Sequence, residues 1–396
     1  MLVDFIGNPS DKSLFPSPIV GSPNDNIPTS GDVHLYADPL THYKKQPTLY
    51  ADCEGFEGGE SIPRGIRLRE SEITNIQTQK ADASTNTGLR QKLRNFSYRR
   101  RELKWANSPD KRKREYSVTQ LYPRLLYTFS DVVVFVLRNA RYGIFRKFSH
   151  RSDPNVYYLI SRTFESAVLH KLLDWALKSL EKSLNQFALP HAIIVLNATD
   201  NSVNAKQWDM NEATNAFFAD LGGVMDMNHE FEEYKRFWQD RGKKIESLKD
   251  LLESFYSTVT VIRMPAKPAY MRIKTQLETL HQKIVGCCQS AYNTRLSVRM
   301  LSNADDFHAY LQCAFDHFSS EMDIPFNFIE VSLRYNPIPL DFGGNILKLA
   351  IDIQDRTGWD DGKRIFQKLG HMVASCILLD IARHRSKGKS VYYLLK

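Results

Sequence analysis

The sequence predicts an α/β fold, a mostly parallel sheet flanked by helices, followed by a C-terminal region that is mainly helical. Three β-branched runs, 131–137, 192–196 and 258–263, have the length and composition of strands buried on both faces. Helical patterns separate these runs, and such alternation is typical of a parallel sheet with helices on both faces. After Pro265 the helical patterns dominate.

The first part of the chain adds two expected strands before this alternation begins. Residues 1–31 are rich in Pro, Ser, Asn, Asp and Gly, and predict a loop after one short element at 1–6. Residues 32–36 and 48–51 predict two strands, separated by a turn that contains proline.

A polar and basic stretch follows, and we expect a flexible insertion around residues 56–116. Between residues 90 and 114, eleven basic residues face only two acidic ones, Glu102 and Asp110, so this segment accounts for the net charge of +8. The basic residues are Arg90, Lys92, Arg94, Arg99, Arg100, Arg101, Lys104, Lys111, Arg112, Lys113 and Arg114. We favour a solvated loop and expect no nucleic-acid partner; a nuclear import signal or nucleic-acid patch at 99–114 is the alternative.

Helices are predicted from apolar residues at three- and four-residue steps. The longest such pattern runs from 164 to 187 and is ended by Pro190, and a shorter one covers 121–127 with Pro123 in its first turn. Further helices are expected at 210–221, 248–255, 270–285, 304–319, 346–354 and 363–383. We expect two domains, residues 1–290 with the sheet and residues 291–396 with the C-terminal helices.

Two features that the sequence lacks bear on the expected location of the protein. No run of 18 apolar residues occurs, so we expect no membrane span. The five cysteines form no Cys-x-x-Cys pair, which favours reduced thiols and no zinc site. These observations predict a cytoplasmic protein, with the nucleus as the alternative.

The candidate chemistry begins at Asp52-Cys53-Glu54-Gly55, at the end of the second expected strand. A carboxylate at a strand end can hold Mg²⁺, and a glycine three residues later lets a backbone N–H approach a phosphate oxygen. Asp52 and Gly55 are therefore candidates for sensing magnesium and the γ-phosphate. An ordinary turn at a strand end is the alternative.

A second polar signal, Asn197-Ala198-Thr199-Asp200, ends the strand expected at 192–196. A carboxylate at this place can accept hydrogen bonds from both the ring N1–H and the 2-amino group of guanine. Asn197 and Asp200 are thus candidates for base recognition, with Ala198 where a lysine is usual. The alternative is a turn in which both side chains cap the backbone before a helix.

A third signal, Pro28-Thr29-Ser30-Gly31, lies before both of the others. A threonine in a loop ahead of the Asp-x-x-Gly strand can coordinate Mg²⁺ and close over the γ-phosphate. Thr29 is therefore a candidate ligand of both metal and nucleotide.

Taken in this order, the three signals resemble a G domain. The phrases around Thr29 and Asp52 are similar to those of the large GTPases of the guanylate-binding, atlastin and dynamin type, and more similar to large fungal proteins with such a domain near the N-terminus. The resemblance covers roughly residues 1–265. It implies a P-loop NTPase-like fold, GTP or another purine nucleotide as ligand, Mg²⁺ as cofactor, Mg-dependent hydrolysis as a switch, and a protein partner or homodimer formed through the G domain.

The chain departs from this family in one essential part. It contains no Gly-x-x-x-x-Gly-Lys-Ser/Thr, the loop that holds the phosphates. The nearest stretch, residues 7–13, lacks the second glycine and carries Pro9, which has no N–H. Residues 1–6 resemble the helix that follows such a loop, so we expect the sequence to begin just after it, with impaired triphosphate binding.

Catalysis has no assigned residue at this stage. Phe56 stands where small GTPases carry the water-orienting glutamine, and Glu54 and Glu57 are candidates by proximity alone. The alternatives to a nucleotide switch are a G-fold module without enzymatic activity and a basic nuclear factor.

Overall fold

The structure is a computed structural model that describes residues 33–54, 101–138, 188–221, 230–297, 301 and 303–335, together with isolated residues between 169 and 184 and between 345 and 375. The chain divides into two compact units, residues 1–328 and 329–396. The domain boundary expected near residue 290 falls inside helix α12 (Tyr270–Ser297), which continues through it. In the second unit the structure describes most of α14 (Phe328–Tyr335) and isolated helical residues.

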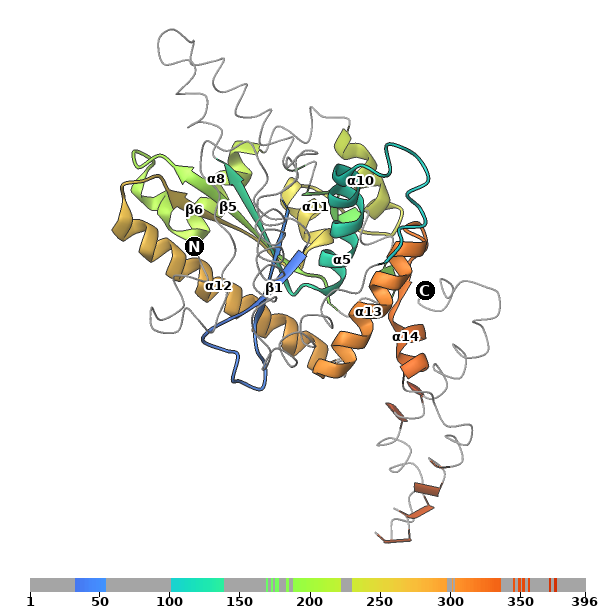
Figure 1. Cartoon of the computed structure of the whole chain (residues 1–396). Helices are drawn as coiled ribbons and strands as arrows, with labels where there is room; N and C mark the ends of the chain where they lie inside the picture. Colours follow the sequence, from blue (N-terminus) through green and yellow to red (C-terminus); the bar gives the residue numbers. More distant parts are fainter. Residues whose placement is uncertain are drawn as a thin grey trace, which may run out of the picture. The chain divides into compact units, whose positions relative to one another are not determined.

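A three-stranded parallel sheet forms the centre of the first unit (Figure 1). Its strands are β3 (Val132–Arg138), β5 (His191–Thr199) and β6 (Val259–Pro265), in the order β3-β5-β6. All three were expected from their β-branched runs. The middle strand is buried from His191 to Val195, as a strand covered on both faces must be.

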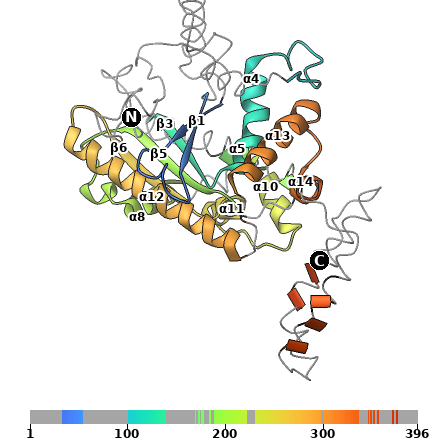
Figure 2. The same ribbon diagram turned by 60° about the horizontal axis from the view of Figure 1, so that its bottom comes forward.

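Helix α12 covers one face of this sheet (Figure 2). Side chains alternate along a strand, so Ile193 and Val195 of β5 share one face. There they join a cluster with Leu277, Leu280 and Ile284 of α12. These three residues recur at three- and four-residue steps, which is why one side of the helix is apolar. The helix was expected to end near residue 285 and continues to Ser297.

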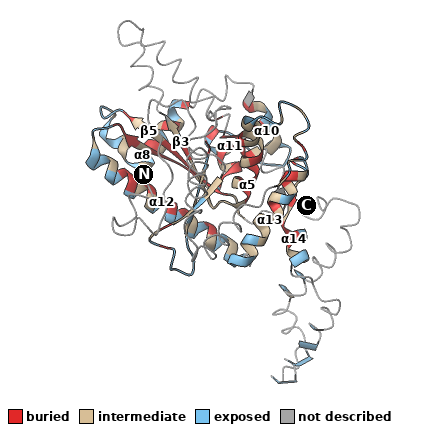
Figure 3. Cartoon of the chain, in the orientation of Figure 1, coloured by how far each residue is buried: buried red, intermediate tan, exposed pale blue. Residues whose placement is uncertain are grey.

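Helices also cover the opposite face of the sheet. Ile194 of β5 belongs to the larger cluster on this face, which also contains Tyr127. The helices that the structure describes over their whole length here are α5 (Tyr122–Phe129), α8 (Met210–Leu221), α10 (Glu230–Gln239) and α11 (Leu248–Phe255), and helical residues between 169 and 177 join the same cluster. Buried positions gather in β5 and α11 (Figure 3). The predicted α/β fold with a parallel sheet flanked by helices is therefore confirmed, and α10 is a helix that was not expected.

The expected helix at 164–187 is right in its middle and wrong near its end. Leu169, Leu172 and Leu173 are helical and buried in the larger cluster. Ser183–Leu184, however, form the short strand β4, which pairs in parallel with β7 (Phe326–Asn327). The pairing with a segment more than a hundred residues away decides this stretch, and periodicity cannot reveal such a partner.

Residues 101–116, which we expected to belong to a flexible insertion, pack against α13 (Ala304–Ser320). Trp105 is 9% exposed, and its indole N–H donates to the carbonyl oxygen of Phe318 at 2.8 Å. Arg101 donates through Nε to Asp316 at 2.6 Å. A helical run then leads from Arg114 through a π-helical stretch into α5. The basic side chains from Arg101 to Arg114 thus stand on a segment that packs through a buried tryptophan, whereas residues 90–100 lie outside the described part of the chain.

The two expected N-terminal strands form a separate antiparallel hairpin, β1 (Val33–Ala37) and β2 (Leu49–Cys53). The buried carboxylate of Asp38 organises their connection, since it accepts from the Thr41 hydroxyl at 2.7 Å and the Leu40 N–H at 3.2 Å. The Thr41 hydroxyl in turn accepts from the Thr48 N–H at 2.9 Å. This network fixes the register of the hairpin.

The packing of Trp105 gives a first prediction. Trp105→Ala should lower the free energy of unfolding by about 3–5 kcal/mol, because it leaves a large cavity against α13. Trp105→Phe keeps most of the ring and loses the hydrogen bond to Phe318, so it should cost about 1–2 kcal/mol. Lys104→Ala, at the exposed neighbouring position, is the matched control. Chemical denaturation followed by circular dichroism measures all three, and equal stability of Trp105→Ala and the wild type would contradict the packing.

Candidate functional site

Asn197 lies near the carboxyl end of β5, and Asp200 follows this strand directly. Both residues are exposed. The Asn197 side-chain oxygen accepts from the Ala198 N–H at 2.9 Å, and Asp200 accepts from the Ser202 N–H at 2.8 Å. Hydrogen bonds from Ser202 hold the pKa of Asp200 below its usual value. Asp200 is therefore a solvent-facing carboxylate that stays ionised at neutral pH.

The turn at the end of β5 is fixed to the loop that follows β6. The pairing of β5 with β6 shifts register between Leu196 and Thr199, and Ala198 adopts a φ of 57°, in the left-handed region. The Ala266 N–H donates to the Thr199 carbonyl oxygen at 2.8 Å, and the Asn201 side chain donates to the Ala266 carbonyl oxygen at 3.3 Å. The two carboxyl-end loops thus hold each other in place.

Asp52 lies in β2, the second strand of the hairpin. Tyr50 of the same strand packs against the cluster formed by β5, β6 and α12, as do Val132 and Val134 of β3. Burial raises the pKa of Tyr50, as this packing requires. The hairpin therefore packs on the side of the parallel sheet that α12 covers.

The end of β2 is tied to a distant segment of the chain. Just after the strand, Glu54 pairs with Arg114, whose Nε donates to the carboxylate at 2.5 Å. Arg114 begins the helical run that leads into α5, and β3 follows this helix. The ion pair therefore connects the strand that carries Asp52 to the segment that leads into the parallel sheet.

Glu54 and Arg114 form a largely buried ion pair. The Glu54 side chain is 1% exposed and that of Arg114 is 21% exposed. The sequence made Glu54 a candidate for orienting water by proximity alone, and placed Arg114 in a basic run expected to be solvated. The two residues are 60 positions apart, so no local pattern signals the pair. Such a pair ties the end of β2 to the start of the helical run, and removal of either partner leaves an uncompensated charge.

Two of the predicted site residues, Thr29 and Gly55, lie outside the described residues. Thr29 and Asp52 were the expected Mg²⁺ ligands, and of these two the structure describes Asp52. Within the described part of the chain, no cluster of three or more His, Cys, Asp or Glu side chains could hold a metal ion. One carboxylate fits Mg²⁺ only when phosphate oxygens and water complete the coordination shell.

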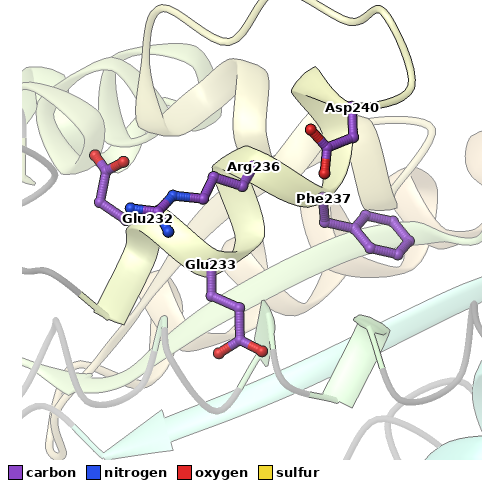
Figure 4. A pocket seen from close by; sticks show the side chains of 5 residues that line it. All are labelled: Glu232, Glu233, Arg236, Phe237 and Asp240. Atoms are coloured by element: carbon purple, nitrogen blue, oxygen red, sulfur yellow. The ribbon is translucent and has the colours of Figure 1, made fainter.

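A hollow of about 410 Å³ runs along α10, away from these residues. Figure 4 shows its lining side chains, which all come from α10 and the residue after it. They are Glu232, Glu233, Arg236, Phe237 and Asp240. One side of a single helix cannot enclose a ligand, so we assign this hollow no binding role.

Comparison with known proteins gives no relative. No protein family, no curated protein and no solved structure matches the chain at a significant level. In the described parts of the chain, the search for a helix apolar and long enough to cross a membrane finds none.

The buried ion pair gives the second prediction. Arg114→Ala leaves the Glu54 carboxylate buried without its partner, and should lower the free energy of unfolding by about 3–5 kcal/mol. Lys113→Ala is a matched control one residue away. Its partner is Asp110 at 2.6 Å, and the two side chains are 54% and 83% exposed, so its loss should cost less than about 1 kcal/mol. Urea denaturation of both variants tests this, and similar losses in the two would contradict the burial of the Glu54 pair.

Proposed function

We propose that the first unit binds a purine nucleoside triphosphate with Mg²⁺, GTP before ATP, at the carboxyl edge of the parallel sheet. In this proposal Asp200 and Asn197 contact the base, and Asp52 lies on the side of the phosphates. Thr29 and Gly55 complete the expected set from the sequence. A GTPase-type switch in a P-loop NTPase-like fold is the function we infer for this arrangement.

One observation carries the proposal. Ligands of open parallel sheets bind beyond the carboxyl ends of the strands. The exposed, ionised Asp200 stands at this edge, directly after the middle strand, and Asp52 lies on the hairpin that packs against this sheet. A carboxylate offers about four acceptor sites, so the hydrogen bonds from Ser202 leave capacity for the two N–H donors of guanine.

Phosphate binding is the weak part of the site. The chain has no Gly-x-x-x-x-Gly-Lys-Ser/Thr. Mg²⁺, when bound, would neutralise phosphate charge beside Asp52. Because the Glu54 carboxylate is buried against Arg114, we assign it no catalytic role and propose binding without a named general base.

A second candidate function is an α/β interaction module without enzymatic activity. The observation that favours it is that the side chains of Asn197 and Asp200 already cap their own turn. Such caps have a structural purpose of their own, which is to satisfy backbone N–H groups beyond the end of a strand.

Nucleotide titration of the full chain tests the first candidate. Isothermal titration with GTP and with ATP, each with and without MgCl₂, should show a preference for GTP. Asp200→Asn should weaken GTP binding by about 10- to 100-fold and leave ATP binding unchanged, because only guanine donates hydrogen bonds to the charged carboxylate that the substitution removes. Asp52→Asn should weaken both nucleotides, and only when Mg²⁺ is present.

Asp220→Asn is the control for a lost negative charge, since Asp220 is an exposed carboxylate on α8. It should bind both nucleotides as the wild type does. A wild-type chain that binds neither nucleotide would leave the interaction module as the function. Equal losses for GTP and ATP in Asp200→Asn would refute base recognition by this residue.

A further inference from the structure

The hairpin β1–β2 presents an apolar face to solvent. Residues directly opposite each other in an antiparallel pair share one face. Three such pairs place six apolar residues on one side, namely Val33 with Cys53, Leu35 with Ala51, and Ala37 with Leu49. Leu35 is 56% exposed and Leu49 is 48% exposed.

The other face of the hairpin carries the polar residues and turns inward. It holds the pairs His34 with Asp52 and Tyr36 with Tyr50. Tyr50 packs against the cluster formed by β5, β6 and α12. An antiparallel sheet with one solvated face normally places its apolar residues inward and its polar residues outward. The reversed arrangement indicates that the outward face is covered when the protein performs its function.

The connection between the strands extends this surface and gives it charge. Leu40 is 47% exposed and Tyr43 is 73% exposed. Between residues 33 and 54, the exposed residues with charged side chains are Lys44 and Lys45. The surface is therefore an aliphatic ribbon with a basic end.

The dimensions of the ribbon match one helix. Two strands about 4.8 Å apart make a strip close to the 10–12 Å diameter of an α-helix with its side chains. Five residues of strand span about 17 Å, the length of roughly eleven helical residues. A helix is also the element that usually covers a sheet face in α/β proteins.

We propose that this face docks a single amphipathic helix of a partner protein. The apolar stripe of that helix lies along Leu35 and Leu49, and its acidic side chains face Lys44 and Lys45. A second copy of this chain is a poorer occupant, because the same face brings two more lysines and no exposed acid. The proposal is independent of nucleotide binding, since Asp52 lies on the opposite face of the hairpin.

A selection experiment tests the class of the partner. The probe is a phage library of a single-helix peptide scaffold with randomised surface positions, selected against the full-length protein. Enriched peptides should carry apolar residues at i, i+3 or i+4, and i+7, flanked by Asp or Glu. Leu35→Ser combined with Leu49→Ser should reduce binding of the selected peptides by at least about tenfold. Leu296→Ser is the control, at a leucine of α12 that is 51% exposed.

Charge reversal separates recognition from simple stickiness. Lys44→Glu combined with Lys45→Glu should shift the selected flanks from acidic to basic residues, which an unfolded or merely adhesive variant cannot do. Unchanged flanks, or peptides that do not depend on Leu35 and Leu49, would overturn the proposal.

Two further measurements test whether the apolar face binds a second copy of the chain or a membrane surface instead of a partner helix. A dimer in sedimentation experiments that Leu35→Ser dissolves would replace the helix with a second copy. Flotation with phosphatidylserine vesicles that requires Lys44 and Lys45, without selection of helical peptides, would replace it with a membrane surface.

Discussion

The fold depends on the burial of β5 on both faces. A strand with helices on both sides must be apolar at every position, and β5 satisfies this from Ala192 to Val195. Ile194 belongs to one cluster and its neighbours Ile193 and Val195 to the other, so this one strand joins the two halves of the core. Polar side chains can follow along the strand only beyond the residues that the helices cover. The candidate site at Asn197 and Asp200 is thus a consequence of the packing of the sheet.

The parallel sheet and several of its covering helices could be predicted because their signals are local. β-branched runs and apolar residues at helical spacing lie within a few residues of each other, and they gave the bounds of α8 and α11 as the structure has them. α10 was missed although its apolar residues Phe231, Tyr234 and Trp238 recur at three- and four-residue steps, because the charged residues of EFEEYKRFWQ make the segment polar on average. The helix packs on the core through Phe231 and Tyr234.

The rest of the site depends on contacts that are distant in sequence. The basic run at 99–114 was read as solvated from its charge alone. In the structure, Arg101 pairs with Asp316 and Arg114 with Glu54. Neither partner is near in sequence, and a tryptophan between the two arginines anchors the segment to α13. Through residues 101–114 these contacts connect Glu54, directly after β2, to α13.

Strand geometry also separates the two functions proposed for the hairpin, which are nucleotide binding with Asp52 and docking of a partner helix on the apolar face. Asp52 and Cys53 are neighbours in sequence, yet a period of two directs their side chains to opposite faces. Substitutions of Leu35 or Leu49 therefore alter the apolar face without touching Asp52. A register slip of one residue would exchange the faces, burying the aliphatic side chains and exposing Tyr50. The buried Asp38 network opposes this slip, because it fixes the connection at Thr41 and Thr48. A partner bound to the apolar face would further stabilise the same register, and with it the position of Asp52.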